Sequence, residues 1–259
     1  MSFQVIVDIV SRNWPMFIRG AGVTLLISMI GTIVGFFIGL LIGIIRTIPV
    51  PERGIKKVLF AVLNALLSVY IEVFRGTPMI VQAMVIFYGS AMAFNIHMNV
   101  IFAGILIVSI NTGAYMSEII RGGIVSIDKG QFEAAQAIGM THFQTMTNVI
   151  LPQAIRNVLP ATGNEFVINI KDTSVLNVIA VTELYFQTKT VSGINYKYFE
   201  TFFVASVLYF VMTFTVTQIL RFIERKMDGP ENYIMYANQM QVETPEDALR
   251  RTNKEVVNY

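Results

Sequence analysis

Cysteine is absent from this chain of 259 residues, and charged residues are scarce. Without cysteine there is no disulfide framework, no thiol nucleophile and no metal site with cysteine ligands. Charged residues make up 14% of the chain, whereas a soluble domain carries about 25%. The net charge of +2 gives no reason to expect a nucleic-acid partner. Since 54% of the residues are hydrophobic, the composition predicts a membrane protein.

Long uncharged runs support this prediction. No charged residue occurs in Gly22 to Ile45, in Val100 to Ser117 or in Thr201 to Leu220. A helix of about 20 apolar residues crosses a bilayer. Two further apolar regions, 58–94 and 158–186, are interrupted by charges, and charges at membrane depth usually face a bundle interior or a water-filled cavity. The sequence therefore predicts an all-α integral membrane protein with about five transmembrane helices.

The Lys and Arg residues between these runs predict the orientation. They gather in 46–57, in 121–157 and from Arg221 onward, and basic connecting segments are typically cytoplasmic. This places the N-terminus outside and the C-terminus in the cytoplasm. Region 58–94 is long enough for two crossings, but two crossings would put 46–57 and 121–157 on opposite sides. We therefore interpret it as one crossing, broken near Gly76-Thr77-Pro78.

These boundaries divide the chain into three parts. Residues 1–20 form an extracytoplasmic N-terminal segment, either an amphipathic surface helix or the start of the first span. Residues 21–225 form the membrane domain, with a cytoplasmic loop at 122–157, and residues 226–259 form a cytoplasmic tail.

Glycines recur every fourth residue in the first run and form a stripe of small residues on one helix face. Such a stripe allows close helix packing, either within the subunit or against a partner. The stripe consists of Gly31, Gly35, Gly39 and Gly43.

The loop contains a polar stretch, residues 133–152, that is too short and too polar to be a span. Residues up to Ile138 favour a helix, and Gly139 suits the left-handed position that follows a helix end. Thr141 can then cap a second short helix, which Pro152 stops or kinks. Two short helices at a turn form a compact surface element. It is either an ordered loop or a docking site for a cytoplasmic partner.

This stretch has the spacing E-A-A, three residues, G, nine residues, I-x-L-P. It resembles the cytoplasmic signature of ABC importer permeases, with Val149 where the signature has Ile. The resemblance implies that these residues dock in a cleft of an ATPase, although an exposed Glu133 alone would also suit a solvated face. The implied docking residues are Glu133, Ala134, Ala135, Gly139, Leu151 and Pro152.

Further segments extend the resemblance over residues 18–225 and place it in the polar amino-acid uptake branch (His, Glu, Gln, Arg and cystine type). They are "EVFRGTPMIVQ" at 72–82, "RGGIVSIDKGQFEAAQAIG" at 121–139, "LPQAIRNVLP" at 151–160 and "KDTSVLNVI" at 171–179.

The resemblance implies a type I ABC importer permease fold in the plasma membrane of a prokaryote. It also implies three partners: a cytoplasmic ATPase in two copies, a second permease subunit that is identical or similar, and an extracytoplasmic amino-acid-binding protein. We expect nucleotide binding on a separate chain, because the phosphate-binding pattern G-x-x-x-x-G-K-[ST] is absent. No catalytic residue, cofactor or metal is expected.

An amino-acid substrate is a zwitterion and needs groups for its carboxylate and its ammonium. Arg75, beside the predicted break, suits the carboxylate, or else forms a salt bridge with Glu72. Glu165 and Asp172 share a helix face and suit the ammonium, or else Asp172 pairs with Lys171. Uncharged polar residues in the spans either touch the substrate or bridge helices. They are Asn64, Ser68, Asn111, Thr112 and Tyr115.

Two other classes of function are compatible with charges inside the membrane. A passive channel would use them to line a pore, and a membrane-embedded hydrolase would use Glu165 or Asp172 as a base. The patterns H-E-x-x-H and Gly-x-Ser-x-Gly are absent, and His97 and His142 are predicted on opposite sides of the membrane. Neither alternative explains the 133–152 stretch.

Overall fold

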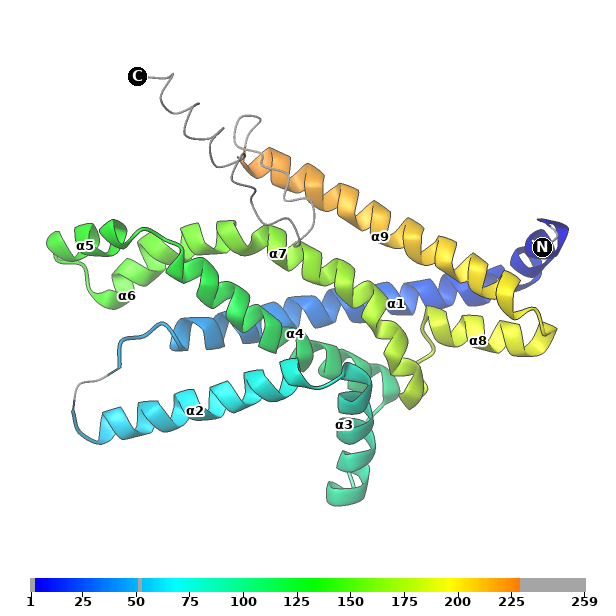
Figure 1. Cartoon of the computed structure of the whole chain (residues 1–259), viewed down its shortest axis with the longest axis horizontal. Coiled ribbons are helices and arrows are strands. Elements are labelled where there is room, and N and C mark those ends of the chain that lie inside the picture. The colour runs from blue at the N-terminus through cyan, green and yellow to red at the C-terminus, as the bar shows by residue number, and fades with distance from the viewer. Residues whose placement is uncertain (1–2, 51–52, 229–259) are drawn as a thin grey trace, which may run out of the picture. The chain divides into compact units, whose positions relative to one another are not determined.

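The computed structural model describes residues 3–50 and 53–228, and within them every regular element is a helix (Figure 1). The residues up to Leu220 form one compact unit. The predicted tail lies outside the described residues except for 226–228, which end the last helix. The elements are α1 (Phe3–Ile45), α2 (Ile55–Gly76), α3 (Met79–Phe94), α4 (Val100–Val125), α5 (Lys129–Ala137), α6 (His142–Thr145), the π-helical turn η1 (Met146–Ile150), α7 (Leu151–Asp172), the 3₁₀ helix η2 (Thr173–Ile179), α8 (Leu184–Asn195) and α9 (Tyr198–Asp228).

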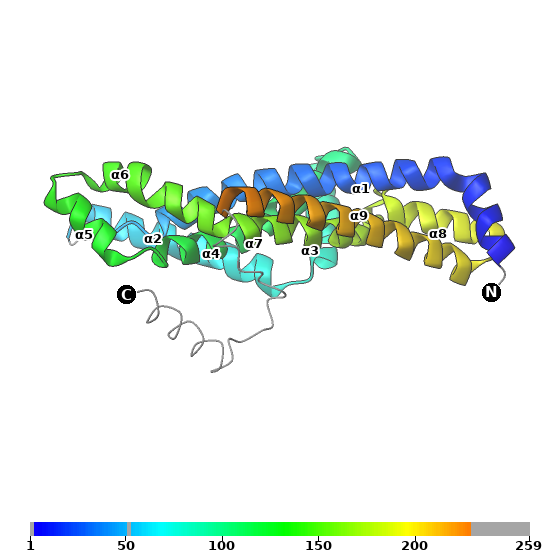
Figure 2. The same ribbon diagram turned by 90° about the horizontal axis from the view of Figure 1, so that it is seen from above.

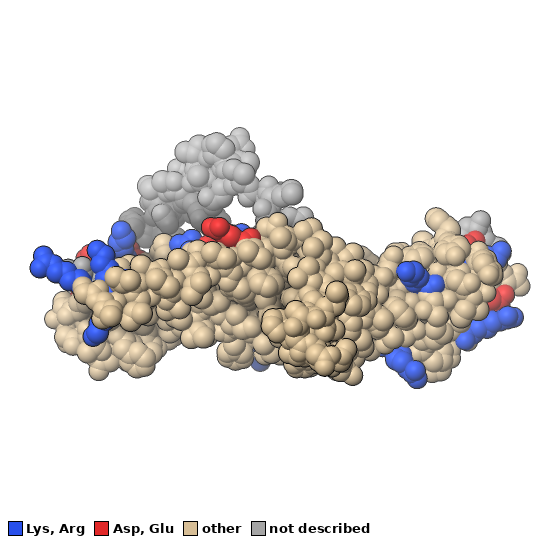
Figure 3. Space-filling view, turned by 90° about the horizontal axis from the view of Figure 1, so that it is seen from below, with Lys and Arg blue, Asp and Glu red and all other residues tan. Residues whose placement is uncertain are grey.

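Among the described residues, 4 helices are long and apolar enough to cross a membrane: α1, α2, α4 and α9. The interrupted region at 158–186 contributes α7, which has 22 residues but carries Glu165, Lys171 and Asp172. The all-α membrane fold predicted from the sequence is confirmed, and α7 as a fifth crossing stays a prediction. A broad band of uncharged surface separates the charged side chains at the two ends of the view in Figure 3.

The N-terminal segment is helical and continuous with the first span, so that α1 runs for 43 residues. Figure 2 shows that its first turns bend away from the rest of the helix. Pro15 lies inside α1, where it removes a backbone hydrogen bond and bends the helix. Ile9 and Phe17 are buried against Leu184 and Val204, so this segment is part of the packed membrane domain.

The glycine stripe of α1 packs against α4, and the two helices lie side by side in Figures 1 and 2. A Cβ atom at Gly35 would lie 2.7 Å from Cβ of Thr112, and one at Gly43 would lie 2.9 Å from a methyl group of Ile120. At Gly39 it would lie 2.7 Å from the backbone carbonyl carbon of Met116. The stripe therefore serves packing within the subunit, which was one of the two predicted alternatives.

The predicted break at residues 76–78 is confirmed. Gly76 ends α2, and Pro78 caps the start of α3, which has only 16 residues. The amide of Gln82 donates to the carbonyl oxygens of Phe74 and Thr77, both at 2.9 Å, and so satisfies backbone groups that the break leaves free. Asn111 on α4 donates to the carbonyl oxygen of Phe74 at 3.2 Å and to Gln82 Oε1 at 2.9 Å.

Candidate functional site

The helix pair predicted at 133–152 begins with α5. Asp128 caps this helix, since its carboxylate accepts a hydrogen bond from the backbone N–H of Gly130 at 2.6 Å. Along α5, Glu133 and Ala134 are exposed and Ala135 is buried. One side of α5 therefore faces the protein, and its other side presents a small residue and a carboxylate to the surroundings.

Gly139 ends α5 in the way that the sequence predicts. Its φ is +81°, in the left-handed region that costs glycine little. The N–H of Gly139 donates to the carbonyl of Gln136 at 2.9 Å, and the N–H of Met140 donates to that of Ala135 at 3.0 Å. This pair of bonds is a Schellman motif, which satisfies the last carbonyl groups of the helix.

The second helix begins as predicted but does not end as predicted. Thr141 caps it in a capping box, with the N–H of Thr141 donating to Gln144 Oε1 at 2.9 Å and the N–H of Gln144 donating to Thr141 Oγ1 at 3.3 Å. Two effects of Pro152 were predicted, to stop this helix or to kink it, and the stop is wrong, because α6 continues through η1 into α7. The N–H of Leu151 reaches back five residues to the carbonyl of Met146. This wider turn lets the helix accommodate Pro152, which has no N–H of its own.

The helix pair has an apolar inner side and an exposed outer side. Met146, Ile150 and Ala154 are buried against Ile120 and Ile124 of α4. On the outer side, Ile138 is 79% exposed and Phe143 is 75% exposed. Both side chains lie on an element that is too polar to be a membrane span, so lipid contact does not account for their exposure.

The predicted docking residues divide into two groups by exposure. Glu133, Ala134, Gly139 and Pro152 are exposed, and Ala135 and Leu151 support them from inside. The sequence reasoning did not include Ile138 and Phe143 among the docking residues. The signal in the sequence that could have identified them is that both are large apolar residues beside Gly139, within a polar stretch.

An ion-pair network ties α1 to α4 near this helix pair. Glu118 on α4 accepts hydrogen bonds from Arg46, directly after α1, and from Arg121, which lies 3.0 Å away on α4. The sequence reasoning used these arginines only for orientation. The ion pair between Arg46 and Glu118 fastens the end of α1 to α4, and Arg121 binds the same carboxylate from within α4.

The break between α2 and α3 brings some predicted substrate residues together. The guanidinium of Arg75 lies over the ring of Tyr115, 5.5 Å from its centroid, and remains exposed. Arg75 and Glu72 form no ion pair in the described structure, so that alternative is not observed. Asn111, one turn before Tyr115 on α4, holds the broken end of α2.

The other candidates make no described contact with Arg75. Glu165 is buried in α7, whereas Asp172 is exposed at its end. In the part of the chain that the structure describes, Lys171 and Asp172 form no ion pair. The amide of Asn64 donates to the carbonyl of Phe60 in its own helix at 3.0 Å. The site is therefore assembled only around the break.

Two buried polar clusters hold the membrane domain together and were not assigned from the sequence. Asn169 Nδ2 donates to Thr32 Oγ1 at 2.8 Å and to Thr112 Oγ1 at 2.9 Å, and so links α7, α1 and α4. Glu183 caps α8 by accepting from the N–H of Tyr185 and of Phe186, at 2.8 and 2.7 Å. Among the described residues no buried side-chain nitrogen or oxygen lacks a hydrogen-bond partner, and this indicates structural roles for both clusters.

The long apolar helices and the helix broken between α2 and α3 are the features of a membrane transport subunit. The chain belongs to the family of binding-protein-dependent transport system inner membrane components, whose model matches residues 54–229. It is therefore a multi-pass membrane component of a transporter rather than an enzyme, and the family predicted from the sequence is confirmed.

The chain is similar to bacterial permeases over most of its length. It is 40% identical over 216 residues to the "Glutamine transport system permease protein GlnP" of Escherichia coli (strain K12), which covers 82% of this chain and 93% of the relative. It is also 40% identical over 171 residues to the "Probable amino-acid permease protein YxeN" of Bacillus subtilis (strain 168), covering 65% of this chain and 76% of the relative.

Solved structures share the fold. The crystal structure of an amino acid ABC transporter with histidines matches with a TM-score of 0.74 and 37% identity, covering 87% of this chain and 99% of that one. An inward-facing structure of the MetNI methionine ABC transporter matches with a TM-score of 0.68 and 19% identity, with the same coverage. The second match supports the fold alone.

Proposed function

We propose that this chain is the permease subunit of an ABC importer for a polar amino acid in the plasma membrane of a prokaryote. The similarity to the glutamine permease, 40% identity over 93% of that protein, carries the proposal. An extracytoplasmic binding protein delivers the amino acid, and a separate ATPase drives its translocation. No observation favours the passive channel or the hydrolase.

The helix pair α5–α6 is the docking surface for the ATPase. Glu133, Ala134 and Gly139 offer a surface without bulky side chains, and Ile138 and Phe143 offer exposed apolar groups beside it. Each of two permease subunits, identical or similar, receives one ATPase subunit. Because α6 is continuous with α7 through η1, a displacement of the docking surface is transmitted along α7 into the membrane domain.

The substrate path passes the break between α2 and α3. Arg75 is exposed there and has no carboxylate partner in the described structure, so its guanidinium is available for a substrate carboxylate. Glu165 and Asp172 on α7 are the proposed partners of the substrate ammonium. Asn64 and Asn111 remain in the proposed path, although Asn111 also holds the broken end of α2.

Reconstitution tests the proposal. The chain is co-purified with its ATPase and its second permease subunit and is reconstituted in liposomes. ATP is enclosed in the lumen, which stands for the cytoplasmic side, and the binding protein and radiolabelled polar amino acids are added outside. We expect uptake that requires both ATP and the binding protein. Equal flux without either component would support the passive channel and refute the proposal.

A further inference from the structure

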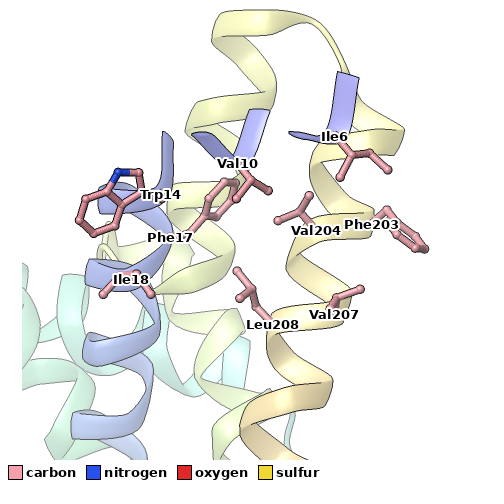
Figure 4. Close-up of a pocket in the computed structure, with 9 residues that line it drawn as sticks. All are labelled: Ile6, Val10, Trp14, Phe17, Ile18, Phe203, Val204, Val207 and Leu208. Atoms are coloured by element: carbon pink, nitrogen blue, oxygen red, sulfur yellow. The ribbon is translucent and has the colours of Figure 1, made fainter. Parts of the chain in front are cut away.

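The apolar groove between the first turns of α1 and the start of α9 is unsuited to a zwitterionic substrate. Its volume is about 330 Å³, and the residues that line it are aliphatic or aromatic. Figure 4 shows Phe17 of α1 and Val204 of α9 close together within it. Asp8, Arg12 and Arg19 lie on the same part of α1, but none of them lines the groove. Charges buried there would lack partners, so the contacts of a charged substrate are better sought at the break between α2 and α3.

Uncharged side chains satisfy the end of α2 at this break. Thr77 Oγ1 donates to the carbonyl of Val73 at 2.7 Å, and the amide of Gln82 donates to the carbonyls of Phe74 and Thr77, both at 2.9 Å. Arg75 lies in the last turn of α2, where an arginine can itself bind the final carbonyl groups of a helix. Because neutral donors bind these carbonyls, the end of α2 does not take up the N–H groups of Arg75.

Tyr115 on α4 is the described contact of the Arg75 guanidinium. The guanidinium carbon lies over the ring, 5.5 Å from its centroid. Within the described residues Arg75 forms no ion pair, and Glu72, one turn earlier on α2, is exposed and forms none either. A cation–π contact acts through the charge of the guanidinium and needs no hydrogen bond from it. Arg75 is therefore held while its N–H groups stay free to bind a carboxylate.

The position of Tyr115 is fixed from α4. Its side chain is half-buried, and the side chains on either side of it in sequence, Ala114 and Met116, are fully buried. Asn111, one turn earlier on the same face of α4, donates to the carbonyl of Phe74 at the end of α2, at 3.2 Å. The ring that contacts Arg75 and the amide that holds the broken helix therefore belong to one rigid element.

We infer that Tyr115 is a positioning residue, whose ring holds the guanidinium of Arg75 ready for the substrate carboxylate. The inference rests on the proposed function, in which Arg75 binds that carboxylate. An arginine side chain has many rotamers, and ordering it before the substrate arrives lowers the entropic cost of binding. Tyr115 acts through Arg75 and does not itself contact the substrate.

Fluorinated phenylalanines at position 115 test the contact at nearly constant ring size. Tyr115→Phe is the reference, and nonsense suppression introduces phenylalanines with increasing numbers of fluorine atoms. Fluorine withdraws electrons from the face of the ring and so weakens its attraction for a cation. In the reconstituted complex with ATP and binding protein, we expect the initial uptake rate to fall stepwise along the series, by about two- to fivefold in total, as for an exposed cation–π contact. A flat series overturns the inference, because packing alone does not depend on fluorination.

Two control series isolate the pair. The ring of Tyr70 lies 5.2 Å from that of Phe74, and among the described residues no cation lies over it. The same phenylalanines at position 70 should therefore give equal rates. With Arg75→Ala in the background, the series at position 115 should also become flat, because the cation is gone. A slope that persists in that background means that the ring contacts the substrate ammonium, and it overturns the positioning role.

Arg75→Ala without any other change separates this inference from the proposed function. If Arg75→Ala loses transport and the series at position 115 is flat, the positioning role is refuted and the substrate role of Arg75 stands. If Arg75→Ala transports normally, both roles are refuted. Uptake by the unchanged protein that needs neither ATP nor binding protein refutes the proposed function, and this inference with it. Co-purification of the ATPase with each variant confirms that the complex has assembled.

Discussion

Gly139 has a positive φ and open space where a side chain would lie, so a substitution there tests the proposed docking directly. A Cβ atom there would meet nothing within 4 Å, so a side chain would point away from the chain itself. We predict that Gly139→Asp abolishes ATP-coupled uptake while the protein still inserts, because the charge blocks close approach of the ATPase and the left-handed backbone becomes strained. The measurement is binding-protein-dependent uptake in liposomes, with insertion checked by the elution of the purified complex.

Gly54 provides the control for backbone strain. Its φ is +84° and it also has open space around it, but it lies before α2, outside the helix pair. Gly54→Asp should therefore retain most of the uptake. Normal uptake by an inserted Gly139→Asp variant would remove the docking role.

Arg75 is the residue on which the substrate proposal depends. We predict that Arg75→Ala lowers transport by one to two orders of magnitude while the ATPase still co-purifies. A hydrogen bond to a charged group contributes about 1.5–3 kcal/mol, and about 1.4 kcal/mol corresponds to tenfold. Arg75→Lys should rescue poorly, since an ammonium lacks the planar fork of a guanidinium. Initial uptake rates in liposomes measure both effects.

The double variant Arg75→Ala with Glu72→Ala distinguishes the two roles considered for Arg75. If Arg75 binds substrate, the double variant stays as defective as Arg75→Ala. Restored transport would mean that the arginine only neutralises Glu72 in another state of the transporter.

At the scale of elements, the contact between α1 and α4 predicts that the same substitution, glycine to alanine, changes stability in opposite directions at two positions of α1. Gly39→Ala places a Cβ atom against the backbone of α4 and should destabilise the protein by about 1–3 kcal/mol, the usual cost of overpacking. At Gly22, on the same helix, a Cβ atom meets nothing within 4 Å. Gly22→Ala should stabilise by up to about 1 kcal/mol through helix propensity. Thermal unfolding of the purified complex compares them, and equal shifts would contradict the packing role of the stripe.

The continuous helix from α6 into α7 has a mechanical consequence at the same scale. A loop between the proposed docking helices and α7 would absorb motion, whereas a continuous helix transmits it. Between α6 and α7 the helix changes to π-helical hydrogen bonding at η1, from Met146 to Ile150. Its wider hydrogen bonding adapts the helix to Pro152, so that α6 continues into α7 without a break.

At the scale of the whole molecule, the orientation and the number of crossings remain predictions. Single cysteines at three exposed positions test them, because the chain has no native cysteine. We predict that a membrane-impermeant maleimide added to intact cells labels Met92→Cys, at the end of α3, and leaves Arg53→Cys and Gln131→Cys unlabelled. After permeabilisation all three should react. If α2 and α3 each crossed the membrane, residues 53 and 131 would be accessible from opposite sides.

Several features followed from the sequence alone because their causes are local or compositional. The apolar runs identified a membrane protein, and the spacing of the 133–152 motif identified the family. Gly139 and Thr141 end and begin helices through hydrogen bonds to residues only three to five positions away, as the Schellman motif and the capping box show. The break at 76–78 also follows from adjacent residues, since Pro78 favours the extended backbone that Thr77 adopts before it.

Only the tertiary structure decided features whose partners lie far apart in the sequence. The glycine stripe of α1 could have faced another subunit, and its partner α4 became known only from the packed helices. Gln82, Asn169 and Glu183 gave no signal that separated structural from ligand-binding polar residues. Their roles depend on which groups the fold brings within hydrogen-bond distance, such as Thr32, which lies 137 residues before Asn169. Local patterns determine where helices start and end, whereas packing determines which faces meet and which polar groups remain free to bind a substrate.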